Sequence, residues 1–181
     1  FSFRSVGIEA QGRTTILRLN YRNTAEVLNV ADEFARDVLK PHDADDDGVP
    51  LVQPRGADRH GPEPQLRRLG SLRDEAAYLA RLFGELHKNG YGWEEMAVVY
   101  RSGFVEPEIS EAFDRAGVPT VTLTRRERSS NRADKVALVT FHSSKGLEYR
   151  VVAIPGLGFL PGDEQLETAE VRLAYVAMAR S

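Results

Sequence analysis

Three short runs of apolar residues constrain the fold of this chain more than any other feature. They cover residues 96–100, 136–140 and 151–154, and none of them shows a strict alternation of apolar and polar side chains. A strand with one face in water alternates, whereas a strand covered on both faces forms a nearly continuous apolar run. We therefore expect these runs to be buried strands of a parallel sheet.

Stretches with helical periodicity separate these runs from one another and from weaker ones. Further candidate strands are residues 15–19, 65–69 and 118–123. Candidate helices are residues 24–39, 72–88, 105–116 and 165–180. Strands that alternate with helices indicate an α/β domain with an open, mostly parallel sheet flanked by helices.

Cap and turn residues support this division of the chain. Asn23 is followed three residues later by Glu26, which is typical of a capped helix start. Gly90 and Gly117 stand where the second and third helices should end. Residues 42–64 are rich in Asp, Gly and Pro, and we expect them to form a loop.

The composition excludes several classes of protein. A chain of 181 residues, 41% of them hydrophobic, has the size of one globular domain, so we expect a single domain over residues 1–181. There is no cysteine, which excludes disulfide scaffolds, thiolate zinc sites and cysteine nucleophiles. The net charge of −3 argues against a freely acting basic nucleic-acid binder, although a local basic patch is compatible with it.

Targeting signals and chain ends give two further expectations. No run approaches the roughly 18 apolar residues of a membrane helix, and no basic-then-apolar leader is visible, so we expect a cytoplasmic protein without a membrane partner. The chain starts at Phe1 and stops at Ser181 within an apolar-periodic run. We expect it to be a segment of a longer protein.

Basic side chains follow several of the candidate strands. Arg22 and Arg101 each come soon after a strand, and His142 and Lys145 follow the run 136–140. The carboxyl ends of strands in an open α/β sheet meet at one edge, where ligands bind. Arginine and lysine there, together with helix N-termini, suit phosphate groups. We therefore expect an anion-binding edge.

The last candidate helix carries one basic residue near its apolar face. The apolar stripe consists of Leu166, Ala169, Leu173, Val176 and Ala177. Arg180 lies seven residues after Leu173 and so projects from nearly the same face. A charged side chain on such a face needs an anionic partner, which is another subunit, a carboxylate or a bound phosphate.

Three segments resemble motifs of one known family. They are LRLNYRNTAEVLNVADEF, VALVTFHSSKGLEYRVVAIPGL and EVRLAYVAMARS, in that order. They are similar to motifs in the second RecA-like domain of the UvrD/Rep family of superfamily 1 DNA helicases. The pattern Thr-x-His-x-x-Lys-Gly-Leu-Glu, directly after a strand, is the most specific of them. The resemblance implies a RecA-like fold and a part in an ATP-dependent DNA helicase that takes part in DNA repair or a related process.

The resemblance also implies a set of nucleotide contacts. Arg22 and Arg180 would act as catalytic arginine fingers on the γ-phosphate of ATP. Glu148 would accept hydrogen bonds from the ribose, and Arg172 and Gly146 would help to form the nucleotide site.

A second set of residues would contact single-stranded DNA. By resemblance, Thr140 and His142 would touch the DNA backbone, and Arg101 and Lys145 would assist them.

The chain lacks one part that such a motor needs. No Gly-x-x-x-x-Gly-Lys-Ser/Thr motif is present, so the chain has no phosphate-cradling loop of its own. ATP and Mg²⁺ would then be bound mainly by an N-terminal RecA-like domain of the same parent chain, and we expect this segment alone to be inactive. Two alternatives stay open: a catalytically degenerate module for protein or DNA binding, and the helicase part of a helicase-nuclease.

Structural alternatives exist for several of these residues. His142 could be a hydrogen-bonded structural histidine, and Glu148 could simply pair with Lys145. Tyr91 and Trp93 are expected to be packing residues rather than a base-stacking platform. An isolated arginine such as Arg22 is commonly a surface ion pair.

Two polar segments have no clear function from their sequence. Residues 43–48 resemble a run of calcium ligands but lack the glutamate of an EF-hand, and a solvated loop is the preferred interpretation. Residues 125–135 carry five basic and two acidic side chains, which is compatible with steering DNA and equally with a solvated loop.

Overall fold

The computed structural model describes residues 19–20, 23–36, 55–56, 59–101, 103–123, 134–159 and 167–178. The chain divides into two units, residues 1–64 and residues 65–181. Within the described residues, no helix combines the length and the apolar character needed to cross a membrane. The expected loop at residues 43–48 lies outside the described residues, as do residues 125–133 of the polar segment 125–135.

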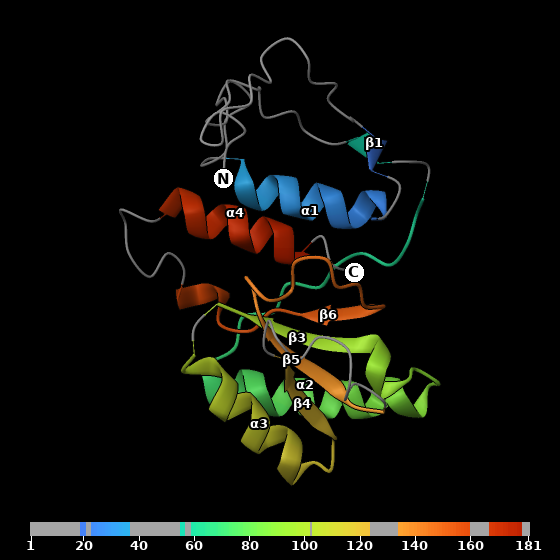
Figure 1. Cartoon of the computed structure of the whole chain (residues 1–181), viewed down its shortest axis with the longest axis vertical. Coiled ribbons are helices and arrows are strands. Elements are labelled where there is room, and N and C mark those ends of the chain that lie inside the picture. The colour runs from blue at the N-terminus through green and yellow to red at the C-terminus, as the bar shows by residue number, and fades with distance from the viewer. Residues whose placement is uncertain are drawn as a thin grey trace, which may run out of the picture. The chain divides into compact units, whose positions relative to one another are not determined.

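The second unit is built on a four-stranded parallel sheet (Figure 1). Its strands are β3 (Met96–Tyr100), β4 (Thr120–Leu123), β5 (Val136–Thr140) and β6 (Val151–Ala153). They follow the order β4-β5-β3-β6, and all neighbouring pairs are parallel. Val98 of β3 lies opposite Leu138 in β5 and Ala153 in β6. The parallel sheet expected from the apolar runs is confirmed.

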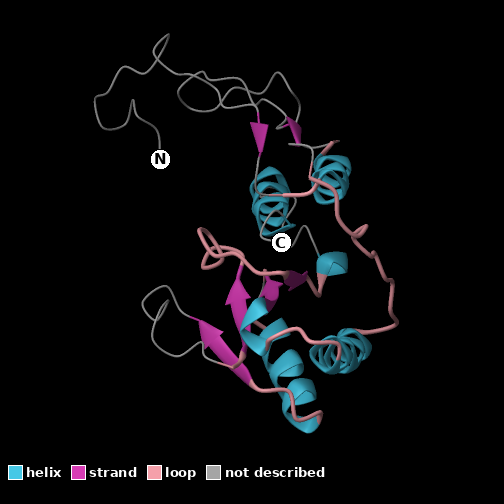
Figure 2. Ribbon diagram, turned by 90° about the vertical axis from the view of Figure 1, so that its right-hand side faces the viewer, coloured by secondary structure: helices cyan, strands magenta, loops and turns pink. Residues whose placement is uncertain are grey.

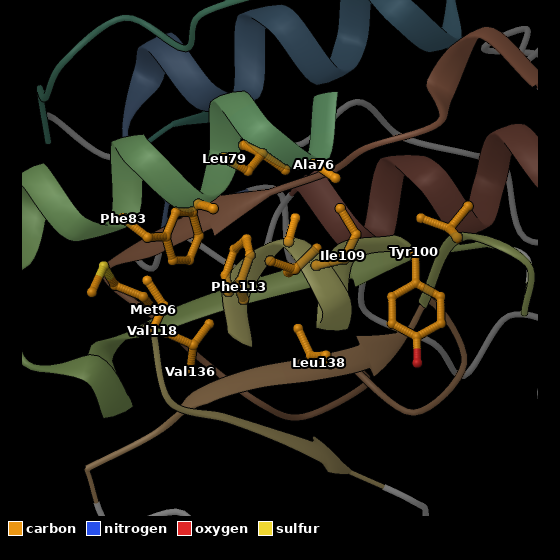
Figure 3. Packing of buried hydrophobic residues seen from close by; sticks show 14 residues of the cluster. Ala76, Leu79, Phe83, Met96, Tyr100, Ile109, Phe113, Val118, Val136 and Leu138 are labelled. Carbon is orange, nitrogen blue, oxygen red and sulfur yellow. The ribbon is translucent and has the colours of Figure 1, made fainter. Parts of the chain in front are cut away.

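Two helices cover one face of this sheet and form the main core with it. They are α2 (Leu72–Lys88) and α3 (Val105–Arg115), which lie on the same side of the sheet (Figure 2). Figure 3 shows side chains of both helices meeting those of β3 and β5. The rings of Phe83 and Phe113 meet at the centre, with centroids 5.3 Å apart, and both are fully buried. Burying such rings is a main source of stability in a domain of this size.

The opposite face of the sheet is buried as well. Met96, Val98 and Tyr100 face the core under the helices, so Ala97 and Val99 point to the other side. Both are completely buried, and the corresponding residues of β5 are buried too. Burial on both faces explains why these strands form continuous apolar runs rather than alternating ones.

The predicted limits of α2 and the glycines expected after α2 and α3 are confirmed. The hydroxyl of Ser71 accepts a hydrogen bond from the Asp74 amide and so begins α2. Gly90 and Gly117 follow the last residues of α2 and α3 with φ angles of +97° and +69°. This left-handed conformation ends a helix and is easiest for glycine.

The first unit contains one helix and a two-stranded parallel ladder. The elements are β1 (Leu19–Asn20), α1 (Ala25–Ala35) and β2 (Arg55–Gly56). The helix is capped by Thr24, whose hydroxyl accepts from the Val27 amide at 3.4 Å, and not by Asn23 as expected. Asn23 is buried instead. The start of the helix was therefore predicted one residue too early.

Glu26 of α1 has a different role from the capping one that its spacing suggested. Its carboxylate lies 2.8 Å from Nδ1 of His60 and accepts a hydrogen bond from the Gly61 amide. The bond with His60, followed by bonds with backbone amides, lowers the pKa of Glu26 to about 2. Glu26 thus ties the first turn of α1 to residues 59–61.

Two other expectations about the elements are wrong. Residues 65–69 form no strand, and Leu66 in this segment is 87% exposed. The apolar residues there do not pair with a neighbouring strand of the described sheet, so local pattern alone was misleading. The segment 42–64, expected to be a loop, contains the short strand β2.

A cluster of side chains holds the amino edge of the sheet. Glu95 lies in the short 3₁₀ helix η2 (Trp93–Glu95), and its carboxylate accepts hydrogen bonds from the Gly92 amide and from Arg150. The Arg150 guanidinium also lies over the ring of Tyr91, 4.7 Å from its centroid. Tyr91 and Trp93 both pack against the core, which confirms their expected structural role.

This cluster predicts a pH-dependent contribution of Glu95 to stability. Hydrogen bonds from Gly92 and then from Arg150 lower the pKa of Glu95 below its ordinary value of 4.5. A lowered pKa in the folded state means that the stabilisation is complete above pH 4.5 and is lost as the pH falls through the lowered value. We expect Glu95→Gln to lower the melting temperature at neutral pH and to approach the wild type in acid.

The measurement is thermal unfolding followed by circular dichroism over this pH range. Glu94→Gln removes an exposed carboxylate from the same 3₁₀ turn and serves as the matched control. A difference between Glu95→Gln and the wild type that does not shrink in acid would contradict the assignment.

Candidate functional site

The carboxyl ends of β3 and β5 place several predicted site residues at one edge of the sheet. Tyr100 and Thr140 are Cα partners in the ladder, and the Phe141 amide donates to the Tyr100 carbonyl at 2.9 Å. Arg101 therefore leaves the sheet beside the start of the turn that carries His142. Arg101 and the turn between β5 and β6 (residues 141–150) therefore lie at a common edge of the sheet, as expected.

The β5–β6 turn is held by a compact set of hydrogen bonds. The Ser144 amide donates to the Thr140 carbonyl at 2.9 Å, and the Ser143 amide donates to the Thr140 hydroxyl at 3.2 Å. The Ser144 hydroxyl donates to the Phe141 carbonyl at 2.8 Å. Phe141 and Ser144 are buried, so they anchor the turn in the interior. The backbone that carries the other side chains of the turn is thereby held in place.

The side chains that the turn presents to solvent are those of the predicted site. His142, Lys145 and Glu148 are exposed, and Arg101 on the adjacent strand end is partly buried. The Thr140 hydroxyl accepts from an amide and keeps its own proton to donate. This edge therefore offers hydroxyl, imidazole and ammonium donors, which suit the oxygens of phosphate groups.

Other predicted site residues are not placed by the structure. Arg22 and Arg180 lie outside the described residues. Arg172 lies within α4 (Glu167–Met178), and its side chain is likewise outside the described part.

A comparison with known protein families identifies the domain. A model of the UvrD-like helicase C-terminal domain matches residues 15–127 and 120–181. The chain belongs to this family. The four-stranded parallel sheet with its helices is accordingly a RecA-like α/β helicase C-terminal domain.

Curated relatives of this helicase C-terminal domain are ATP-dependent DNA helicases. PcrA of Staphylococcus epidermidis strain RP62A is 25% identical over 168 residues, which are 87% of this chain and 21% of PcrA. PcrA of Staphylococcus aureus strain Mu50 is 27% identical over 112 residues, 60% of this chain and 14% of the relative. Rep of Escherichia coli K12 is 42% identical over 65 residues, 33% of this chain and 10% of Rep. The matched region thus spans about a fifth of the length of the first relative and a smaller share of the other two.

The final helix of the helicase C-terminal domain is described for only part of the face that was expected to be apolar. Among its described side chains, Val171, Ala174 and Ala177 are buried, while Val176 is only partly so. Val176 and Ala177 belong to the expected stripe, whereas the side chains of Leu166, Ala169 and Leu173 lie outside the described part.

Two aromatic residues at the same edge were missed by the sequence analysis. Phe104 precedes α3, and Phe159 ends the 3₁₀ helix η3 (Leu157–Phe159) after β6. Their rings meet with centroids 5.4 Å apart and both remain half exposed. The sequence signal that could have indicated them is a Gly-Phe pair shortly after a strand, at Gly103-Phe104 and at Gly158-Phe159.

Tyr100, the last residue of β3, has no acid–base role at neutral pH. Burial, followed by the nearby charge of Glu106, raises the pKa of Tyr100 to about 12. The phenol therefore stays protonated and acts as part of the core below the edge.

The shape of the β5–β6 turn predicts opposite effects for two glycine substitutions. Gly146 has a φ of +81°, which is strained for any other residue, whereas Gly84 lies inside α2. An added Cβ would meet no atom within 4 Å at either position, so the backbone alone decides the result. We expect Gly146→Ala to destabilise the chain by about 1–2 kcal/mol. Gly84→Ala should stabilise it by about 0.5–1 kcal/mol.

Urea unfolding curves of the two variants and the wild type measure these changes. A midpoint for Gly146→Ala that is unchanged or raised would show that the left-handed turn at Gly146 is not retained.

Proposed function

We propose that this chain is the second motor domain of an ATP-dependent DNA helicase or translocase, and that residues 1–181 act as one functional domain of a longer parent protein. The observation that carries the proposal is the edge where Arg101 meets the Thr140–Glu148 turn on a RecA-like sheet. The relatives PcrA and Rep support the proposal, since each is an ATP-dependent DNA helicase.

ATP is the proposed substrate of the parent protein. The chain has no Gly-Lys phosphate loop, so the phosphates and Mg²⁺ would be held mainly by an N-terminal RecA-like domain of the parent. Mg²⁺ would neutralise charge on the phosphate oxygens. In this proposal, Arg22 and Arg180 reach the γ-phosphate from this chain and stabilise the negative charge that develops during its transfer to water.

The remaining nucleotide contacts of the proposal come from the β5–β6 turn and α4. Glu148 is exposed in the turn and carries the acceptor oxygens that ribose hydroxyls need. Gly146 supports the turn by its left-handed conformation. Arg172 would order the site from α4.

Single-stranded DNA is the second proposed ligand. Thr140, His142, Lys145 and Arg101 lie on two adjacent strand ends and supply donors for backbone phosphates. When the two motor domains close around ATP, contacts of this kind would shift along the single-stranded DNA. The chemistry of ATP would thereby be converted into movement on DNA.

The arginine assignment predicts the behaviour of two variants of the full-length protein. We expect Arg22→Ala and Arg180→Ala each to lower DNA-stimulated ATP turnover by about 10³-fold or more, because each removes a charge from the transition state. DNA binding should be largely retained. Turnover is measured with and without single-stranded DNA.

Arg115→Ala is the matched control, because Arg115 is an exposed arginine that pairs only weakly with Glu111 at 3.7 Å. Near-normal turnover in both test variants would refute the finger assignment. If the wild-type parent is inert although its nucleotide domain is folded, the chain is a degenerate binding module. Hydrolysis by the 181-residue chain alone would also contradict the proposal.

The DNA assignment predicts a change in salt dependence. Each phosphate contact with a single strand contributes about 0.7 to the slope of log affinity against log salt concentration. We expect Lys145→Ala to reduce this slope in the full-length protein by about that amount. Lys88→Ala is the matched control, because Lys88 is an exposed lysine in the last turn of α2, close to the amino edge of the sheet. Equal salt-dependence slopes for Lys145→Ala and Lys88→Ala would show that the DNA does not contact Lys145.

A further inference from the structure

The Phe104–Phe159 pair is an unusual feature of the carboxyl edge. Each residue is 52% exposed, and the two ring planes meet at 89° with centroids 5.4 Å apart. Phe104 follows β3 and Phe159 follows β6, and these strands are neighbours in the sheet. The pair therefore lies at the same edge as Arg101, on the side toward β6.

The edge-to-face geometry leaves aromatic surface in contact with solvent. In such a pair, the edge of one ring meets the face of the other, so the remaining faces are not used by the pair. Large apolar side chains at a strand-end turn are costly to expose, and a ligand with a flat face would cover them. Nucleobases have flat faces and stack on aromatic side chains with little dependence on sequence.

The loop that carries Phe159 is held in place by other elements. The Gly156 amide donates to the Glu75 carboxylate of α2 at 2.7 Å. Gly156 has a φ of +76°, and a Cβ there would lie 3.3 Å from Val105 and 3.6 Å from Phe159. The backbone thus fits closely between the start of α3 and the ring. A ring that is already positioned loses little freedom when a ligand stacks on it.

Charges along the edge indicate which part of a nucleic acid lies where. The ends of β3 and β5 carry the cations Arg101 and Lys145 against the carboxylate of Glu148, whereas α3 begins beside Phe104 with Glu106 and Glu108 in its first turn. Phosphates are attracted to the former and repelled by the latter. A single strand along this edge would accordingly hold its phosphates toward β5 and turn bases toward the aromatic pair.

We propose that Phe104 and Phe159 form a nucleobase-stacking site for single-stranded DNA, which extends the phosphate contacts of the β5–β6 turn toward β6. This inference rests on the proposed function, because it requires DNA to pass along the edge. It adds base contacts that no motif of the sequence indicated.

The experiment compares two labelled oligonucleotides of equal length and charge, oligothymidine and the same strand with abasic sites in place of bases. Binding to the full-length protein is followed by fluorescence anisotropy. The test variants are Phe104→Leu, Phe159→Leu and the double variant, in which apolar side chains are kept and flat rings removed. Phe104→Trp and Phe159→Trp keep a flat ring. Leu66→Ala removes an exposed apolar side chain of the extended segment 65–69 and is the control.

We expect the double leucine variant to bind oligothymidine about tenfold or more weakly, since base–aromatic stacking contributes strongly to such binding. Binding to the abasic strand should be unchanged, and the tryptophan variants should bind like the wild type. Glu75→Gln keeps both rings but weakens the Gly156 anchor. It should therefore give a smaller loss, again confined to oligothymidine.

Three outcomes would overturn the inference. An equal loss for both oligonucleotides would show that the substitution acts through folding or phosphate contacts. No loss for either would show that the rings do not stack on bases, and would leave the pair as a contact surface for protein. A wild-type parent that binds neither strand would refute the proposed function itself, and the inference with it.

Discussion

Burial of β3 and β5 on both faces is the constraint on which the rest of the domain depends. Strands without a solvent face must be covered twice, so they occupy the interior of a parallel sheet. Parallel strands then all end at the same edge. The turn after β5 and the start of α3 are brought together there by the pairing of Tyr100 with Thr140, and not by any direct attraction between site residues. The candidate site is thus a consequence of how the apolar core is organised.

The two edges of the sheet use charged and aromatic side chains for different purposes. At the amino edge, Arg150 is paired with Glu95 and lies over Tyr91, so its charge is already balanced within the structure. At the carboxyl edge, Lys145 is exposed on a turn anchored from below, and two half-exposed rings lie farther along. Paired charges stabilise a fold, whereas exposed donors on an anchored turn are available to a ligand. This contrast, rather than net charge, distinguishes the candidate binding edge of an acidic chain.

Much of this arrangement could be predicted from the sequence, because buried strands and amphipathic helices leave strong local signals. The limits of β3, β5 and α2 agree with the predicted ones. Prediction failed where a distant partner decides the outcome. Residues 65–69 have the composition of a strand but no neighbour in the described sheet, and Glu26 binds His60, 34 residues away, instead of serving as a capping residue. The roles of Arg22 and Arg180 stay predictions that rest on motif resemblance.

The Phe104–Phe159 contact shows why part of a site escapes sequence analysis altogether. The two residues are far apart in the chain, and neither belongs to a recognisable motif. They meet because β6 pairs with β3, and because Glu75 fixes the backbone at Gly156 from a third element. Most of the proposed phosphate-binding residues cluster in one turn and are visible as a motif. A stacking surface, by contrast, needs only two ring faces at a suitable place, so many sequences can supply it. We therefore expect base contacts to vary among such domains more than phosphate contacts do.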